Sequence, residues 1–304
     1  MSYSDAERPE CAKNDRDGIS VCISGKERDI GDMTVRRILP SLSCRSVGPF
    51  VFWDEMGPAV FEPGGGLTVR PHPHINLATV TYVFEGEIMH RDSLGVEQPI
   101  QPGAVNWMTA GKGIVHSERT RPELRAEGAK LHGIQAWLAL PKEFEEIEPS
   151  FQHHPKEELP TFQRGGAEVA LIAGEGFGHQ SPVSVLSPLC YADIRLKTGA
   201  SLQIPEEYSE RAAYVVSGIL TVGSKKSTGP EMLVFAKGAK PTLVAESDCR
   251  LMFLAGESMP EPRYLWWNFV SSDKKRIEKA KEDWQEGRFP VVPGDEDESI
   301  PLPK

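Results

Sequence analysis

The chain has 304 residues, of which 39% are hydrophobic and 26% are charged, as in a soluble globular protein long enough for two domains. Its net charge of −10 argues against direct nucleic-acid binding, which needs a basic face to neutralise phosphates. No apolar run approaches the roughly 18 residues that span a bilayer, and the polar N-terminus does not resemble a signal peptide. We therefore expect a cytoplasmic protein with no membrane partner.

The five cysteines are dispersed along the chain without any CxxC spacing. They are Cys11, Cys22, Cys44, Cys190 and Cys249. An odd, scattered set without an export signal indicates reduced thiols and argues against a cysteine zinc site. Ordinary buried cysteines and a redox-sensitive thiol, such as Cys44, both remain open.

The first half of the chain predicts a series of β-strands. Residues 1–30 have no clear hydrophobic period, whereas residues 48–61 form an apolar-aromatic run between Gly-Pro pairs. The glycines at 64–66 indicate a turn rather than a phosphate-binding loop, because the next residues alternate like a strand. Further strands are expected at residues 78–89, 114–116 and 133–140, with a hairpin turn at 90–95. Strands at this spacing, separated by Gly, Pro and Asp, indicate an antiparallel sandwich or barrel.

A change of composition separates the two halves. Residues 141–163 are rich in Pro and Glu and poor in apolar periodicity, which is typical of a linker. We therefore predict a first domain at 1–145, a linker at 146–163 and a second domain at 164–304. His153 and His154 lie in this region, and adjacent residues of an extended chain point in opposite directions. A solvated pair is expected there rather than a metal site.

The second half repeats the β pattern without the same chemistry. Apolar runs recur from Glu168 to about residue 256 with Gly, Pro and Asp in the turns, so one supersecondary plan is used twice. The first half has Gly66-x5-His72-x-His74, where the second has Gly199-x5-Pro205-x-Glu207. We expect no metal site in the second half.

The C-terminal region changes character again. Residues 264–269 (YLWWNF) predict an aromatic strand used for core or interdomain packing rather than for binding a ligand. A helix should follow, with Ser271 or Ser272 as its cap and Gly287 near its end. The apolar face of that helix should consist of Ile277, Ala280 and Trp284. The last residues form an exposed or wrapping acidic tail.

Two pairs of polar residues in the first half indicate a metal site. His72 and His74 lie two apart on one predicted strand, and His116 and Glu118 lie two apart on another. Alternate side chains of a strand share a face, so each pair points its two members the same way. A lone histidine is more often a satisfied core or surface residue, but HxH and HxE in one small β domain favour a divalent metal. Pro73 lacks a ladder donor and places its strand at an edge or bulge.

These residues carry a resemblance to a known family. Gly66-x5-His72-x-His74, followed by Gly86, resembles the first cupin motif. PHPH, ATVTYVFEGEIMHRDSLG, WMTAGKGIVHSE and the C-terminal RYLWWNFVSS resemble the pirin branch of that superfamily, over most of residues 45–304. The resemblance implies an all-β fold of two tandem cupin domains, each an antiparallel β-sandwich or barrel, with a C-terminal helix. It also implies four metal ligands: His72, His74, His116 and Glu118.

The sequence departs from the family pattern beside the histidines. The general cupin motif has a carboxylate four or five residues after HxH, where this chain has Ala78 and Thr79. Glu118 is therefore the well-placed carboxylate, as in pirins. Many pirins have HPHRGFE where this chain has HPHINLA, so that Ile75 and Ala78 replace an arginine and a glutamate. We expect a less charged pocket than in those members.

The resemblance implies iron(II) as the metal. Three imidazoles and one carboxylate leave about two open positions in an octahedral shell. Such a site also suits manganese, nickel or cobalt, and zinc remains open because the affinity order alone does not select iron.

The resemblance implies two functions, of which we expect the first and keep the second as the alternative. One is a quercetin 2,3-dioxygenase-type enzyme that acts on a small flavonol-like aromatic substrate, with the metal as Lewis acid and Glu118 as general base. The alternative is an iron protein that binds partner proteins, such as transcription regulators or metabolic enzymes, according to its redox state and without turnover. A weaker third reading is a storage cupin with an inert site. Four aromatic residues are candidates for a flat pocket, although each suits core packing: Phe50, Phe52, Trp53 and Trp107.

Overall fold

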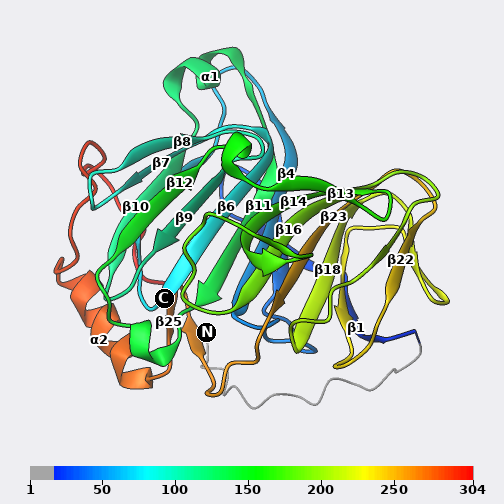
Figure 1. Ribbon diagram of the computed structural model, residues 1–304. Helices are drawn as coiled ribbons and strands as arrows, with labels where there is room; N and C mark the ends of the chain where they lie inside the picture. Colours follow the sequence, from blue (N-terminus) through cyan, green and yellow to red (C-terminus); the bar gives the residue numbers. More distant parts are fainter. Residues whose placement is uncertain (1–16, 304) are drawn as a thin grey trace.

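The computed structural model describes residues 17–303, and the predictions for residues 1–16, including Cys11, lie outside this range. Two β halves lie side by side, the first coloured from blue through cyan to green and the second from green through yellow to orange (Figure 1). Each half consists of one large and one small antiparallel sheet. No helix within residues 17–303 is both long enough and apolar enough to cross a bilayer.

The first half carries the predicted metal ligands on its small sheet. In spatial order, the large sheet contains β12 (Ser150–His154), β9 (Val105–Thr109), β6 (Leu77–Gly86), β11 (Ala129–Ala139), β4 (Phe50–Phe61), β3 (Thr34–Leu39) and β2 (Lys26–Asp29). The small sheet contains β5 (Thr68–His74), β10 (Ile114–Arg119), β7 (Ile88–Asp92) and β8 (Glu97–Ile100). Short helical segments are α1 (Pro122–Glu127) and the 3-10 turns η1 (Lys142–Phe144) and η2 (Lys156–Glu158).

The second half repeats this plan. Its large sheet contains β1 (Ile19–Ile23), β21 (Glu231–Phe235), β18 (Glu210–Ser217), β23 (Cys249–Gly256), β16 (Leu189–Leu196), β14 (Ala167–Gly176) and β13 (Thr161–Arg164), with β15 (His179–Gln180) beside β14. Its small sheet contains β17 (Ser201–Gln203), β22 (Thr242–Ala245), β19 (Leu220–Val222) and β20 (Lys225–Ser227). Buried apolar side chains from both sheets fill the space between them.

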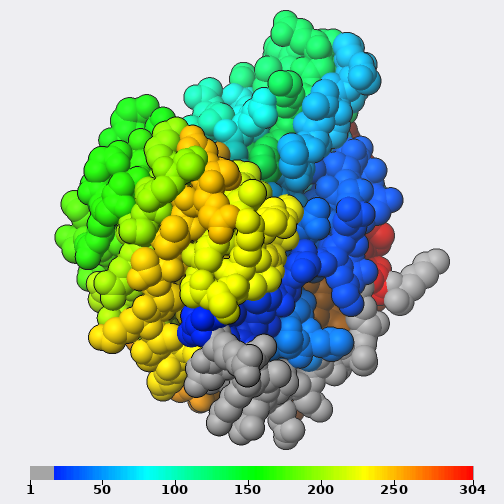
Figure 2. Space-filling model, turned by 90° about the vertical axis from the view of Figure 1, so that its right-hand side faces the viewer, coloured from blue at the N-terminus to red at the C-terminus, as the bar shows by residue number. Residues whose placement is uncertain are grey.

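The two halves exchange their terminal segments. The early strand β1 pairs with β21 of the second half, and the blue early chain lies against the yellow and orange residues in Figure 2. In the other direction, the hairpin of β24 (Tyr264–Trp266) and β25 (Phe269–Ser271) packs on the first half, where Phe269 bridges to Ile75. The amide of Ile300 then donates to the carbonyl of Pro71, at 2.9 Å. The C-terminal segment therefore wraps the strand that carries His72 and His74.

The C-terminal helix begins slightly later than we expected. Helix α2 (Lys274–Gln285) is capped by Asp273, whose carboxylate accepts a hydrogen bond from the amide of Lys275 at 2.9 Å. The predicted caps are wrong because their hydroxyls have other partners. The Ser272 hydroxyl donates to Glu145 at 2.8 Å, and the Ser271 hydroxyl accepts from the amide of Asp273 at 3.1 Å. The predicted apolar face does face the first half, with Ile277 and Ala280 buried.

The segment predicted as a linker is partly built into the first half. Its strand β12 pairs with β9 of the first half. His153 and His154 lie on this strand, and each has a polar partner. His153 Nδ1 lies 2.7 Å from Asn106 Oδ1, and His154 Nδ1 lies 2.9 Å from a Glu158 carboxylate oxygen. The domain boundaries themselves stay a prediction.

The largest core lies between the two halves. The two large sheets pack face to face, because strands such as β6 are apolar on both sides: Val80 and Tyr82 face the other half, and Val83 faces the interior of its own half. Phe50 and Trp53 are fully buried at this interface, with ring contacts to Tyr191 of the second half at 5.7 and 5.6 Å. These two side chains, and Trp107 in the same cluster, are core rather than pocket residues.

Candidate metal centre

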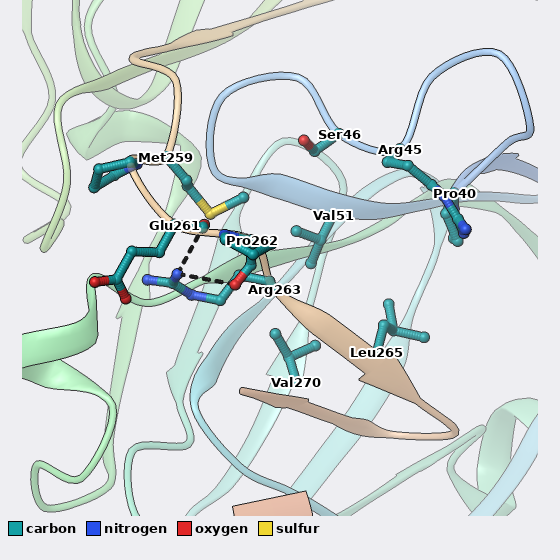
Figure 3. A pocket seen from close by; sticks show the side chains of 11 residues that line it. Pro40, Arg45, Ser46, Val51, Met259, Glu261, Pro262, Arg263, Leu265 and Val270 are labelled. Carbon is teal, nitrogen blue, oxygen red and sulfur yellow. Dashed lines mark hydrogen bonds between the residues drawn. The ribbon is translucent and has the colours of Figure 1, made fainter. Parts of the chain in front are cut away.

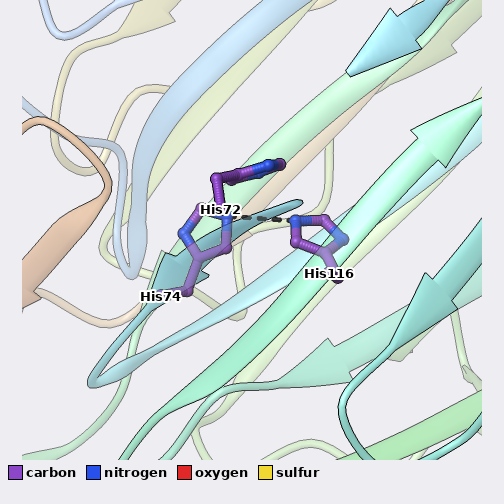
Figure 4. A group of neighbouring side chains, drawn as sticks. All are labelled: His72, His74 and His116. Carbon is purple, nitrogen blue, oxygen red and sulfur yellow. Dashed lines mark hydrogen bonds between the residues drawn. The ribbon is translucent and has the colours of Figure 1, made fainter. Parts of the chain in front are cut away.

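Strands β5 and β10 bring the three predicted histidines together. The strands are antiparallel, and His72 is the direct cross-strand partner of His116. Because side chains alternate along a strand, His74 lies on the same face as His72. Figure 4 shows the three rings turned towards one another. One nitrogen from each lies within 4.8 Å of the others, and no other such group of His, Cys, Asp or Glu side chains occurs within residues 17–303.

The spacing of the nitrogens fits a bound divalent metal. His74 Nε2 and His116 Nε2 lie 3.1 Å apart. Two nitrogens bound to one metal at about 2.1 Å lie about 3.0 Å apart at right angles, and about 3.4 Å apart at the tetrahedral angle. The observed distance lies within the range expected for two nitrogens that share one metal ion.

The far side of each ring is hydrogen bonded, which determines which nitrogen faces the centre. His72 Nδ1 lies 2.8 Å from the carbonyl of Arg70, and His74 Nδ1 lies 3.0 Å from the carbonyl of Asn268. A carbonyl only accepts, so both Nδ1 atoms carry the proton and both Nε2 atoms keep their lone pairs. The partner of His116 Nδ1 is different: it is His90 Nδ1, at 3.5 Å.

Burial keeps the three imidazoles neutral. His72, His74 and His116 are only 6%, 0% and 1% exposed. Desolvation lowers the pKa of His72 to about 4, and it lowers the pKa values of His74 and His116 well below the ordinary value. Neutral imidazole is the form that binds a metal, so the site is ready to bind one at neutral pH.

These pKa shifts predict that the metal-free protein loses stability in mild acid. His72 takes up a proton near pH 6.5 in the unfolded chain but only at about pH 4 in the folded one. Between these values protons favour the unfolded state, so the free energy of unfolding falls as the pH is lowered, by roughly 3 kcal/mol from this residue. Urea unfolding of wild type and His72→Gln, at about pH 7 and about pH 4.5, measures the effect, because glutamine does not titrate. An equal pH dependence in both proteins would contradict this prediction.

Glu118 lies beside the three histidines but outside their 4.8 Å cluster. A bulge in β10 between His116 and Glu118 shifts its register against β5. The Glu118 side chain is buried, 7% exposed, and its carboxylate accepts a hydrogen bond from the Thr81 hydroxyl at 3.2 Å. Burial raises the pKa of Glu118, although His90 and the Thr81 hydrogen bond oppose the shift. Its role as a fourth ligand stays a prediction.

The two apolar residues that follow the HxH pair, Ile75 and Ala78, are both buried. Ile75 is fully buried against Phe269 from the C-terminal segment, and Ala78 is buried in the core between the two halves. The Trp137 ring lies 5.0 Å from the His74 ring and stacks on Phe52 at 3.9 Å. Of the four aromatic candidates, Phe52 is therefore the one connected to the site.

Sequence reasoning missed three neighbours of the site. The Asn268 carbonyl has no sequence signal, because any residue supplies a carbonyl. His90 and Asp92 were expected in a hairpin turn, but they form the end of strand β7, which pairs with both β10 and β8. Their alternation on one strand could have signalled a pair that shares a face.

A cavity of about 350 Å³ is lined by residues of the segments 40–51 and 259–270. Figure 3 shows Val51, Leu265 and Val270 gathered along one part of its wall. Val51 and Val270 belong to the same apolar cluster as Trp137, whose ring contacts that of His74. The volume falls within the roughly 300–1,000 Å³ of small-molecule pockets, but none of the three histidines lines this cavity.

Comparison with known proteins finds two matching family models and several similar sequences. Residues 32–138 match the family model described as Pirin, and residues 191–290 match the model described as Pirin C-terminal cupin domain. A pirin-like protein of Caulobacter vibrioides is 49% identical over 94% of this chain and 100% of its own length. A Pseudomonas aeruginosa protein, named provisionally as a quercetin 2,3-dioxygenase, is 40% identical over 84% of this chain and 80% of its own length.

Solved structures agree with the fold. A crystal structure titled quercetin 2,3-dioxygenase, from Acinetobacter baumannii, superposes with a TM-score of 0.87 at 32% identity. The match covers 93% of this chain and 95% of that one. The predicted all-β fold of two tandem cupin domains is confirmed.

Proposed function

The chain belongs to the pirin family, and on this premise we propose that it is a metal-dependent dioxygenase of the quercetin 2,3-dioxygenase type, acting on flavonol-like aromatic substrates. One observation carries the proposal: three buried, neutral imidazoles lie together, with one nitrogen of each within 4.8 Å of the others. The names of the Pseudomonas aeruginosa and Acinetobacter baumannii proteins support the same substrate class.

The residues present fit a divalent metal held by His72, His74 and His116, with Glu118 as the proposed fourth ligand. Iron(II) is the metal we propose; manganese, nickel, cobalt and zinc are the other outcomes of metal analysis. When bound, the metal would supply Lewis-acid activation of the flavonol 3-hydroxyl and a template for dioxygen. Trp137, whose ring contacts that of His74, gives the site an apolar neighbour that suits an aromatic substrate.

Glu118 is the residue that we propose takes the proton of the 3-hydroxyl. Its raised pKa makes the protonated form accessible, and the neighbouring hydroxyl accommodates both forms. An ionised Glu118 accepts the Thr81 hydrogen at 3.2 Å. Once protonated, Glu118 can donate to Thr81 Oγ1 while Thr81 donates to Gln135 Oε1, 2.8 Å away. A proton can therefore reside on Glu118 without leaving a buried polar group unpaired.

The function is tested by anaerobic purification, metal analysis and reconstitution with iron(II). A panel of flavonols is then assayed for dioxygen uptake and carbon monoxide release. Turnover with stoichiometric uptake is the expected result. Bound metal without turnover would instead support the redox-dependent binding of partner proteins. A protein that binds no metal would overturn both functions.

The Glu118→Gln variant should lose turnover while it stays folded. Glutamine keeps the shape and can still pair with Thr81, but it cannot take a proton. We expect turnover of the iron(II) protein to fall by about 100-fold or more, as for loss of a general base. Parallel metal titration separates the two proposed roles, because loss of a ligand also weakens binding.

The matched control for this prediction is Glu55→Gln. Glu55 is an equally buried carboxylate of the same half, and it pairs with His132 and Tyr214 rather than with the metal site. It should leave turnover unchanged. Full turnover in Glu118→Gln would exclude Glu118 as the base.

A further inference from the structure

We propose that His90 and Asp92 act as a positioning pair that fixes the tautomer of His116 and thereby the affinity of the three-histidine cluster for a divalent metal. The proposal rests on the metal-binding part of the proposed function and is independent of any turnover. It concerns residues of strand β7 that lie behind the cluster and supply no atom to it.

The starting observation is an asymmetry among the three histidines. His72 and His74 each have a backbone carbonyl at Nδ1, which permits only one tautomer. His116 Nδ1 has the Nδ1 atom of His90 instead, at 3.5 Å. A neutral imidazole nitrogen either donates or accepts, so this contact alone does not fix which nitrogen of His116 carries its proton.

Asp92 removes the ambiguity. His90 Nε2 lies 3.0 Å from Asp92 Oδ2. A carboxylate oxygen accepts, so His90 Nε2–H donates to it, and in the neutral form of the ring Nδ1 then has a lone pair. His90 Nδ1 then accepts from His116 Nδ1–H, and His116 Nε2 is left with a lone pair facing His74 and His72. The hydrogen bonds that link Asp92, His90 and His116 therefore place the proton of His116 on Nδ1. Backbone carbonyls select the same tautomer in His72 and His74.

The pair is held rigidly enough to act in this way. Asp92 is fully buried and His90 is 4% exposed. Across the β7–β10 ladder, Asp92 is the partner of His116 and His90 is the partner of Glu118. The His90 ring stacks on Phe151 at 4.6 Å and meets the His116 ring at 5.3 Å.

The hydrogen bonds of the second carboxylate oxygen of Asp92 make Asp92→Asn an informative variant. Asp92 Oδ1 accepts from the amides of Leu94 and Val96, at 2.9 and 3.2 Å. An asparagine at this position must place its oxygen there, which turns its NH₂ group towards His90 Nε2. His90 then carries its proton on Nδ1 and donates to His116 Nδ1. The proton of His116 moves to Nε2, where it points into the cluster at His74.

The experiment is titration of the metal-free full chain with Co(II) in competition with a chelator of known affinity, at constant neutral pH. Asp92→Asn should raise the Kd for Co(II) by about 10–100-fold, as for loss of an outer-shell partner of a metal ligand. Its circular dichroism and urea midpoint without metal should stay close to wild type, since every hydrogen bond can still form. Wild-type affinity in a folded Asp92→Asn protein would overturn the proposal.

A second pair of variants decides the matter if Asp92→Asn does not fold. His90→Asn and His90→Leu are nearly isosteric, and both remove the partner of Asp92. Only the asparagine can accept from His116 Nδ1–H, because its amide oxygen replaces Nδ1. We expect Co(II) to bind at least about tenfold more weakly to His90→Leu than to His90→Asn. Equal affinities would overturn the proposal.

The control is again Glu55→Gln, which removes the carboxylate partner of His132 at 3.0 Å without contacting the cluster. The Kd of Glu55→Gln for Co(II) should equal that of wild type. If Glu55→Gln weakened Co(II) binding as much as Asp92→Asn does, the effect would come from a general loss of packing, and the proposal would be overturned. A wild-type chain that binds no Co(II) would overturn the metal centre itself. That result is distinct from a failure of the positioning pair, in which wild type binds and the variants bind equally well.

Discussion

Replacement of His74 by alanine is expected to abolish tight metal binding, and with it any turnover that depends on the metal. His74 is fully buried, and its Nε2 lies 3.1 Å from that of His116. Loss of an outer partner of a metal ligand costs roughly 10–100-fold in affinity, and loss of one of three imidazoles should cost more. Calorimetric titration of the metal-free protein with Co(II) or Ni(II) measures the change.

The matched control for His74→Ala is His153→Ala. His153 is a partly buried histidine of the same half, and its ring pairs with Asn106 rather than with the cluster. This variant should bind metal like wild type. A His74→Ala protein that retained wild-type affinity would show that the metal, if any, binds elsewhere, and the central conclusion about the three histidines would be wrong.

Replacement of Trp53 by alanine should destabilise the protein more than any of the other substitutions. Its side chain is fully buried between the two halves, with ring contacts to Tyr191 and Tyr214 of the second half at 5.6 and 5.9 Å. Large-to-small changes of this kind cost about 3–5 kcal/mol, because they leave a cavity that neighbours fill only in part. Because the cluster is shared, both halves should be weakened together. Urea unfolding followed by circular dichroism measures the loss.

Trp53→Phe provides the comparison. The indole Nε1 has no hydrogen-bond partner among the described residues, so phenylalanine removes an unpaired buried donor while it keeps an aromatic ring in the cluster. We expect it to lose less than half of what alanine loses. If Trp53→Ala lost less than about 1 kcal/mol, the interface between the halves would not be a common core.

The short-range pattern of the sequence was enough to predict much of the candidate site. His72 and His74, and separately His116 and Glu118, were paired from spacing alone, because the period of two along a strand depends only on neighbouring residues. The same reasoning gave an all-β fold in two series, since the alternation and the turn residues recur in both halves. The family motif then placed the two strands in one half of the molecule.

What the sequence could not give depends on residues that are distant along the chain. The carbonyl that orients His74 belongs to Asn268, 194 residues away, and a backbone carbonyl leaves no mark in the sequence. Phe50 and Trp53 suited a pocket as well as a core until the second half was packed against them. The bulge beside Glu118 is likewise a property of the β5–β10 ladder rather than of either strand.

The sequence by itself therefore determined the class of fold, the three histidines and the family, because each depends on short-range periodicity or on contiguous motifs. Only the tertiary structure decided the exchange of terminal segments, the wrapping of the metal strand by the C-terminal segment, and the pairing of His90 and Asp92 behind His116. These features arise where sheets and segments from distant parts of the chain meet. Such contacts are selected by packing and hydrogen bonding in three dimensions, and a linear pattern does not specify them.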